Sequence, residues 1–393
     1  MSLLRAAFEQ RQITVPWQGF LVGPSRTDGK TKAGVSVNLE TSLGVSAAWS
    51  CATLLADVVS SLPVVNYRRT KDGRERMEVP AKIVTRPSRI FTRREFLFQA
   101  IVCGAFWGNV YGQVLERDDT TAARAGIPAT VELATPNVIR IDQRGQMTLP
   151  EYHINGTRVP FDDMMHLRRY PQVGSVEGMA PLKLHRDLLG VAIAAQEYAA
   201  RWFGDDAHPA SLLINESEIN EEQAKEAKKR WVAAGRSREP RTLGNGWKYH
   251  QIQASPADSE LADTWNRIGT SVAQVFRVPP EMIGVATSGS SVTYANREQR
   301  SIDFLTYTVE PWLSMFEDWW DQILPDAEFA KFNPDALLRV DTLTRYRVHD
   351  IAIRMGKNSI NEIRRLEDED PITDGDEYLW PPYRAFPVPS DQE

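Results

Sequence analysis

The apolar residues between Ser255 and Leu324 predict two helices joined by a loop. In the first helix they recur at helical spacing. This helix is expected to end before a proline pair, because proline lacks the N–H that a helix needs and disfavours helix in the residue before it. This stripe comprises Leu261, Trp265, Ile268, Val272, Val275 and Phe276. The second helix is predicted to resume near Asn296, and Pro311 within its stripe predicts a kink or break near Glu310.

The connection between these helices is uncharged over the ten residues Ile283 to Val292. Small and polar residues dominate it, and two glycines give it flexibility. Its candidate functional residues are Gly284, Thr287, Ser288, Gly289, Ser290 and Ser291. Two helices can form a wall whose uncharged loop lines a passage, although the same pattern also suits an ordinary connection in a helical domain.

Elsewhere the patterns predict an α+β protein. Two further long helices are expected over 45–61 and 182–203, and Asn220 is expected to cap a helix over 221–234. Short strands bounded by turn residues are expected at 64–69, 130–133, 138–142, 151–154, 164–168, 211–214 and 244–252. The helices over 182–203 and 258–276 therefore enclose a small α+β insert. A smaller helical region is expected after Pro325, where Ser359 and Glu362 have the spacing of a capping box.

One uncharged run, Leu97 to Leu115, is long enough to be considered as a membrane span. Glycine recurs in it at every fourth position, at Gly104, Gly108 and Gly112, as in membrane helices that pack closely. Polar residues interrupt the run, however, and no second span accompanies it. We therefore favour a buried helix from Arg94 that turns near Gly108 into a strand over 109–117.

Composition adds few constraints. The 393 residues correspond to about two or three domains, and 42% hydrophobic with 25% charged residues is typical of a soluble globular protein. A net charge of −6 argues against simple electrostatic adhesion to nucleic acid, but it does not exclude a protein that lets DNA slide past. The two cysteines, Cys51 and Cys103, predict buried thiols in a reduced, intracellular setting.

The absence of recognisable catalytic motifs favours a binding or structural role. The sequence has no phosphate-binding glycine loop, no dinucleotide fingerprint, and no His or Cys spacing typical of a metal site. We therefore expect no cofactor, no metal and no enzymatic activity. The six histidines, His166 among them, are interpreted as packed or surface residues.

Two groups of basic residues stand out. Residues 223–241 carry seven bases against two acids, and they fit either a docking surface for an acidic partner or a solvated helix end. These bases are Lys225, Lys228, Lys229, Arg230, Arg236, Arg238 and Arg241. A looser cluster of Arg86, Arg89, Arg93 and Arg94 is interpreted as intersubunit or surface charge.

Several short motifs, in a fixed order, give the chain a resemblance to a known family. They are Ala47-Ala48-Trp49-Ser50-Cys51-Ala52, Trp107-Gly108-Asn109-Val110-Tyr111, Met164-Met165-His166-Leu167-Arg168, Gly178-Met179-Ala180-Pro181-Leu182, Val278-Pro279-Pro280-Glu281-Met282-Ile283-Gly284, Tyr294-Ala295-Asn296-Arg297-Glu298-Gln299, Pro311-Trp312-Leu313 and Gly356-Lys357-Asn358-Ser359-Ile360-Asn361-Glu362-Ile363-Arg364. From about residue 42 to 382 the chain resembles the portal proteins of tailed double-stranded DNA phages, in the shorter family found in long-tailed phages, prophages and gene-transfer agents.

The resemblance implies a portal-type division of the chain. The parts are an N-terminal arm (1–41), an α+β wing (42–181), a stem helix (182–205), a clip (206–254), a second stem helix (255–278), a tunnel loop (279–295), a long wing helix (296–332), and a small crown with the C-terminal tail (333–393). In this scheme the uncharged loop contacts DNA in the channel, and the basic residues of the clip meet the packaging motor or the adaptor.

The resemblance also implies the partners. It predicts a homo-oligomeric ring of twelve copies at one capsid vertex, through which double-stranded DNA passes without sequence specificity during packaging and ejection. Large terminase, a head–tail adaptor and the major capsid protein are the expected partners, and the particle is expected to assemble in the host cytoplasm and remain in the virion, without a membrane. The alternatives are an enzyme of phage assembly, such as a nuclease or protease, and a membrane pore built on residues 97–115.

Overall fold

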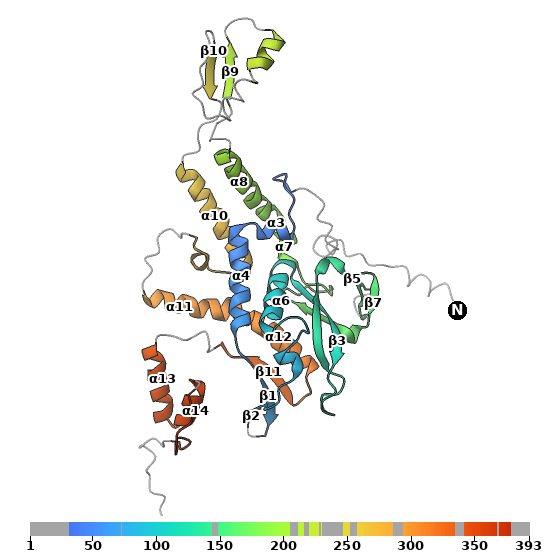
Figure 1. The fold of residues 1–393 in the computed structure, drawn as a ribbon, viewed down its shortest axis with the longest axis vertical. Coiled ribbons are helices and arrows are strands. Elements are labelled where there is room, and N and C mark those ends of the chain that lie inside the picture. Colours follow the sequence, from blue (N-terminus) through green and yellow to red (C-terminus); the bar gives the residue numbers. More distant parts are fainter. Residues whose placement is uncertain are drawn as a thin grey trace, which may run out of the picture. The chain divides into compact units, whose positions relative to one another are not determined.

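The computed structural model describes residues 31–71, 73–143, 148–204, 211–215, 220–227, 229, 247–251, 258–285, 294–334, 342–367 and 369–378. Within these ranges helices alternate with short antiparallel strands, so the predicted α+β class is confirmed (Figure 1). The chain divides into two compact units, one that runs through Phe332 and one that begins at Asn333. Each unit is described by itself.

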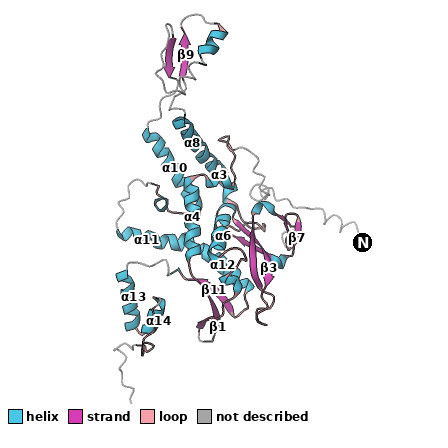
Figure 2. Cartoon of the chain, viewed as in Figure 1, coloured by secondary structure: helices cyan, strands magenta, loops and turns pink. Residues whose placement is uncertain are grey.

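Helices form the centre of the first unit (Figure 2). Helix α4 (Ser46–Ser61) contacts both α6 (Arg93–Trp107) and α10 (Asp258–Phe276). It buries one stripe of small and aliphatic side chains, namely Ala48, Cys51, Ala52, Leu55, Ala56 and Val59. These positions recur every three or four residues, which is the spacing that predicted the helix. Cys51 is a free thiol in this stripe, and burial raises its pKa to about 12.

Helix α6 leads directly into strand β3 (Asn109–Arg117), the central strand of a sheet with β4 (Pro128–Ala134) on one side and β8 (Met164–Arg168) on the other. Gly108 ends the helix in the left-handed conformation, at φ +66°. The uncharged run 97–115 is therefore part helix and part strand, as our favoured interpretation predicted. Among the described residues, no helix is long and apolar enough to cross a membrane.

A second sheet contains β5 (Ile139–Asp142), β6 (Glu151–Ile154) and β7 (Thr157–Val159), in that order. Strands β6 and β7 form a hairpin through Asn155 and Gly156, both of which have positive φ. Asn and Gly tolerate this conformation, and the pair is a strong hairpin signal in a sequence. Strands β6 and β8 have the predicted boundaries.

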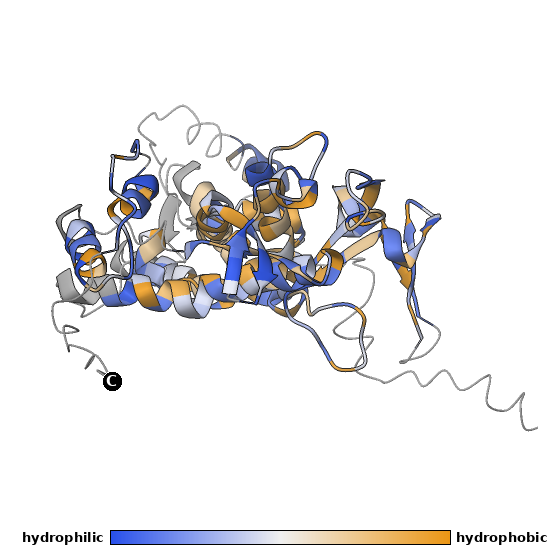
Figure 3. Ribbon diagram, turned by 90° about the horizontal axis from the view of Figure 1, so that it is seen from below, coloured by the Kyte–Doolittle hydropathy of each residue, from blue (hydrophilic) through white to orange (hydrophobic). Residues whose placement is uncertain are grey.

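A third sheet corrects one prediction. Residues Glu328–Phe332, placed in a helical region from the sequence, form strand β11, which pairs antiparallel with β1 (Val64–Thr70). Strand β2 (Gly73–Arg76) lies on the other side of β1, and its residues are exposed and hydrophilic (Figure 3). Aromatic side chains of α12 (Glu310–Ile323) cover β11, with the Trp320 and Phe332 rings 5.3 Å apart.

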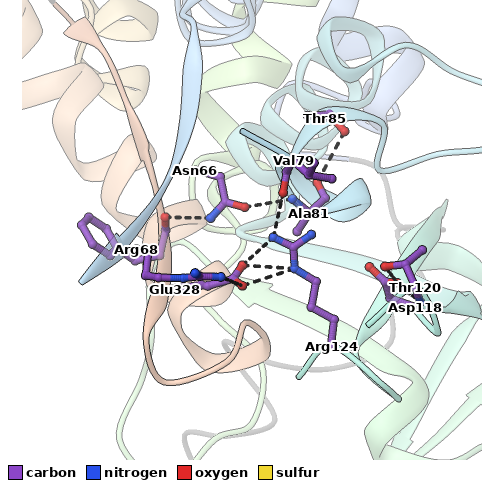
Figure 4. Close-up of polar contacts among 10 residues, drawn as sticks. Asn66, Arg68, Val79, Ala81, Thr85, Asp118, Thr120, Arg124 and Glu328 are labelled. Atoms are coloured by element: carbon purple, nitrogen blue, oxygen red, sulfur yellow. Dashed lines mark hydrogen bonds and ion pairs between the residues drawn. The ribbon is translucent and has the colours of Figure 1, made fainter. Parts of the chain in front are cut away.

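A buried ion pair joins this third sheet to the loop after β3. The Arg124 guanidinium donates from Nη2 to Glu328 Oε2 at 2.8 Å and to the Val79 carbonyl oxygen at 3.0 Å (Figure 4). The two side chains are only 5% and 4% exposed. Asn66 supports the same region, because its amide donates to the Phe329 carbonyl oxygen and accepts from the Ala81 N–H.

The helix predicted over 182–203 is divided in two. A short helix α7 (Pro181–Leu184) precedes α8 (Arg186–Gly204), and His185 leaves the helical conformation between them. Helix α8 contacts α10 and α3 (Leu39–Leu43). The insert between α8 and α10 contains an antiparallel pair, β9 (Ser211–Asn215) and β10 (Trp247–Gln251), together with a helical stretch over 221–227.

The second unit contains helices α13 (Thr342–Arg354) and α14 (Ile360–Leu366). Ser359 and Glu362 form the predicted capping box, in which each side chain accepts the backbone N–H of the other. Glu367 joins the two helices, because its Oε1 lies 2.9 Å from Arg345 Nε and 3.1 Å from His349 Nε2.

Candidate functional site

The described residues include both ends of the uncharged loop. Of the six candidate loop residues, only Gly284 lies among the described residues. Thr287, Ser288, Gly289, Ser290 and Ser291 lie outside them. The geometry of the site is therefore that of the segments at which the loop begins and ends.

The loop begins at a sharply defined turn after α10. Arg277 takes a left-handed conformation (φ 59°), and Val278 N–H donates to the carbonyl oxygen of Ala273, five residues back. This arrangement ends a helix by satisfying its last carbonyl groups. Such a conformation is unfavourable for a residue other than glycine. Here the Thr308 hydroxyl supports it by donating to the Arg277 carbonyl oxygen at 2.7 Å.

A short 3₁₀ turn, Pro280–Ile283, then leads to Gly284. Gly284 is left-handed (φ +78°), which suits glycine, and its N–H donates to the Glu281 carbonyl oxygen. The next residue, Val285, lies against Gly269 of α10. A β-carbon at position 269 would be 2.9 Å from Val285 Cγ2, so the absent side chain makes room for this contact.

The loop returns through α11 (Tyr294–Phe304) and an unusual π-helical turn, η4 (Leu305–Val309), before α12. Arg300 Nη1 lies 2.7 Å from Glu281 Oε1, with both side chains about one-third exposed. This ion pair joins the segment before the loop to the segment after it. It also balances Glu281, the single charge between residues 278 and 296.

Sequence reasoning found the loop but missed its anchors. Arg277, Thr308 and the ion pair of Glu281 with Arg300 carry no local signal, because their partners are 19 to 31 residues away. The π turn that ends at Val309 runs directly into α12, so the chain does not break near Glu310, and the kink expected there stays a prediction.

Among the basic clip residues, the described part of the chain includes Lys225 and Lys229. Both are exposed, and Lys225 pairs with Glu221 one turn away at 2.7 Å. Asn220 caps this helix, since its Oδ1 accepts the Gln223 N–H, as predicted. Lys228, Arg230, Arg236, Arg238 and Arg241 lie outside the described residues. The clip surface therefore remains a prediction.

Three of the sequence motifs meet around Asn109. Its Nδ2 donates to the carbonyl oxygens of Trp107 and Gly178, and its Oδ1 accepts from the Gly178 N–H. A β-carbon on Gly108 would lie 1.9 Å from the Met179 carbonyl oxygen, so only glycine permits this approach. These motifs thus fix the packing of the first unit.

His166 completes this cluster. Its Nε2 lies 3.1 Å from Asn109 Oδ1 and its Nδ1 lies 3.0 Å from the Tyr152 hydroxyl. Because Asn109 Oδ1 can only accept, Nε2 carries the proton and Nδ1 accepts from Tyr152. Burial, helped by the positive charge of Arg168, lowers the pKa of His166 to about 3. The ring is therefore neutral, in agreement with its interpretation as a packed residue.

No cluster of three or more His, Cys, Asp or Glu side chains suited to a metal ion occurs within the described ranges.

Comparisons with known proteins find a family that matches most of the chain. A family model described as phage portal protein matches residues 46–368. The chain is 25% identical over 389 residues to the portal protein of Enterobacteria phage HK97, and the alignment covers 95% of this chain and 90% of that protein. It is 24% identical over 363 residues to a probable portal protein of Streptomyces phage phiC31, with 87% and 78% covered.

Solved structures show the same fold. An HK97-family phage portal protein from Corynebacterium diphtheriae aligns with a TM-score of 0.60 and 19% identity, covering 78% of this chain and 100% of that one. A chain from the neck of a native gene transfer agent particle, computed with C12 symmetry, aligns with a TM-score of 0.53 and 19% identity, covering 85% and 93%.

Proposed function

The chain belongs to the phage portal protein family, and from this premise we propose that twelve copies form a ring at one capsid vertex, with a channel for double-stranded DNA. The family match over residues 46–368 carries the proposal. Twelve copies are favoured because the similar gene transfer agent neck was computed with C12 symmetry. In this assignment the protein resides in the virion, after assembly in the host cytoplasm.

The parts of the chain fit this assignment. Helices α8 and α10, which contact each other, correspond to the stem, and the insert with β9 and β10 corresponds to the clip. The loop after Gly284 corresponds to the tunnel loop, and the second unit to a small crown. Because both ends of the loop are anchored, the proposed contact of the loop with the channel does not disturb the packing of the helices before and after it.

The charge pattern of the loop suits DNA that must move. Residues 278–296 hold one acid and no base, and Arg300 balances that acid. Each Lys or Arg that neutralises a phosphate releases counterions and adds binding free energy. An uncharged lining therefore contacts DNA while holding it weakly.

The clip supplies the docking surface in this proposal. Its bases would meet acidic surfaces of the large terminase during packaging and of the head–tail adaptor afterwards. Exposed Lys225 and Lys229 support the proposal, because an exposed lysine is available to a partner. The major capsid protein is the remaining proposed neighbour.

Electron microscopy of the purified protein separates this function from the alternatives. Rings with a central hole are expected without detergent. Globular monomers would favour an enzyme of assembly, and detergent-dependent particles a membrane pore. The structure argues against the membrane-pore alternative, because residues 97–115 are divided between helix α6 and strand β3.

The loop itself is tested by replacing Ser288 and Ser290 with Arg. Two added charges per copy should raise DNA affinity by roughly a factor of ten or more at low salt, and should slow packaging or ejection. The matched control replaces both residues with Asn, which adds bulk without charge and should leave the salt dependence unchanged. Wild-type kinetics in the Arg variant at low salt would refute a DNA-contacting role.

A further inference from the structure

The turn between α5 (Lys82–Thr85) and α6 is rigid yet displays apolar side chains. Ser88 is fully buried, and its hydroxyl oxygen accepts the N–H groups of Ile90 and Phe91 while donating to the Glu132 carboxylate. The Arg89 N–H also donates to Glu132, at 2.8 Å. On this fixed backbone Ile90 is 75% exposed and Phe91 is 36% exposed.

The same turn carries four arginines, and we name residues 86–94 the Arg–Ile turn. Arg89 and Arg94 have partial partners, Glu116 at 3.5 Å and Asp57 at 3.7 Å. Arg86 is exposed and has no ion pair within the described residues, and Arg93 Nε is buried without a hydrogen-bond partner. An apolar tip with arginines on either side in the sequence has the composition of the centre and rim of a protein interface.

A complementary surface lies on α11, η4 and α12 of the same chain. Here Ile302 is 41% exposed and Tyr307 is 67% exposed, and the exposed carboxylates of Asp303 and Glu310 flank them. Neither carboxylate has an ion pair among the described side chains. We name these four residues the acidic helix face.

We propose that the Arg–Ile turn of one copy docks on the acidic helix face of the next copy, with Ile90 and Phe91 against Ile302 and Tyr307, and arginines against Asp303 and Glu310. The two surfaces come from different segments, so the contact is heterologous and can be repeated around a closed ring. The inference rests on the proposed ring and identifies which residues join its subunits.

A second copy explains the two surfaces better than nucleic acid does. Phosphates would suit the arginines but would leave the apolar tip exposed, whereas the acidic helix face offers both kinds of complement. It also explains why a chain with a net charge of −6 keeps an arginine cluster beside exposed apolar side chains.

Charge reversal of each surface, separately and together, tests the contact. One variant combines Arg86→Glu with Arg94→Glu, a second combines Asp303→Arg with Glu310→Arg, and a third carries all four changes. Mass photometry of the full chain at a fixed concentration gives the fraction in rings. We expect each double reversal to weaken assembly at least about tenfold, and the fourfold variant to recover most of the loss.

The apolar tip is tested with Ile90→Asp. This variant should also reduce the ring fraction, whereas Val173→Asp, at a 90% exposed position elsewhere in the first unit, is the matched control and should not. Circular dichroism should be unchanged in both variants, because the two side chains are largely solvated in the monomer.

The outcomes distinguish this contact from the proposed function. Two results would overturn the contact but leave the portal function standing. One is a wild-type fraction of rings in all three reversed variants. The other is a loss of rings in the double reversals that the fourfold variant does not recover. Loss of binding to a short DNA duplex with unchanged rings would identify the turn as a nucleic-acid surface instead. A wild-type chain that remains monomeric would overturn both.

Discussion

Replacing Arg124 with Met should strongly destabilise the first unit, because it leaves the Glu328 carboxylate buried without its main partner. Arg124 contributes three contacts within 3.3 Å to that carboxylate, and the two side chains are 5% and 4% exposed. The remaining cation, Arg68, is 3.9 Å from Glu328 and half exposed. Breaking a buried pair from one side costs about 3–5 kcal/mol, or roughly two to four orders of magnitude in the folding equilibrium.

The assay is urea unfolding followed by tryptophan fluorescence at a fixed protein concentration, because assembly also stabilises the folded chain. Lys82→Met is the matched control. Lys82 pairs with Glu116 at the same 2.8 Å, but the side chains are 50% and 37% exposed, so the loss should be below about 1 kcal/mol.

A double variant, Arg124→Met with Glu328→Met, completes the test. It should recover most of the lost stability, because two apolar side chains replace the pair without leaving a buried charge. Equal losses for Arg124→Met and Lys82→Met would refute the reasoning, since burial would then not determine the cost.

Three further predictions concern the ends of the loop, the buried histidine and the clip. Thr308→Val should lower the free energy of unfolding by about 0.5–1.5 kcal/mol, because it removes the hydroxyl that donates to Arg277; an unchanged urea midpoint would contradict this role. His166 has a pKa of about 3 in the folded chain, whereas an unfolded histidine takes up its proton below about 6.5, so stability should fall as the pH drops between these values. His166→Gln should remove that part of the pH dependence, as measured by urea unfolding at several pH values. Reversing Lys228, Lys229 and Arg230 to Glu should preserve the fold and weaken terminase or adaptor binding in a pull-down assay; unchanged binding to both would mean that these bases only complement the helix dipole.

The sequence predicted elements whose signals are local. The end of α10 before the proline pair was correct, as was the switch from helix to strand at Gly108, because Pro279 and Gly108 each restrict their own backbone. The capping box at Ser359 was also correct, because its two partners are three residues apart.

Long-range contacts account for the errors. Strand β11 pairs with β1 across more than 250 residues, as the Asn66 bond to Phe329 shows, and no local pattern reveals that partner. Arg124 and Glu328 are 204 residues apart, and no local pattern marks them as a buried pair. The candidate loop was visible as an uncharged run, but its supports at Arg277, Thr308 and Arg300 depend on tertiary packing.

The π turn at Leu305–Val309 has a consequence for helical phase. A π turn accommodates one more residue than an α-helical turn, and each residue advances an α-helix by about 100°. The turn therefore absorbs one extra residue, and α11 and α12 keep nearly the phase of one regular helix. If the same residues formed a regular α-helix instead, α11 would turn by about 100° relative to α12 and direct Arg300 away from Glu281.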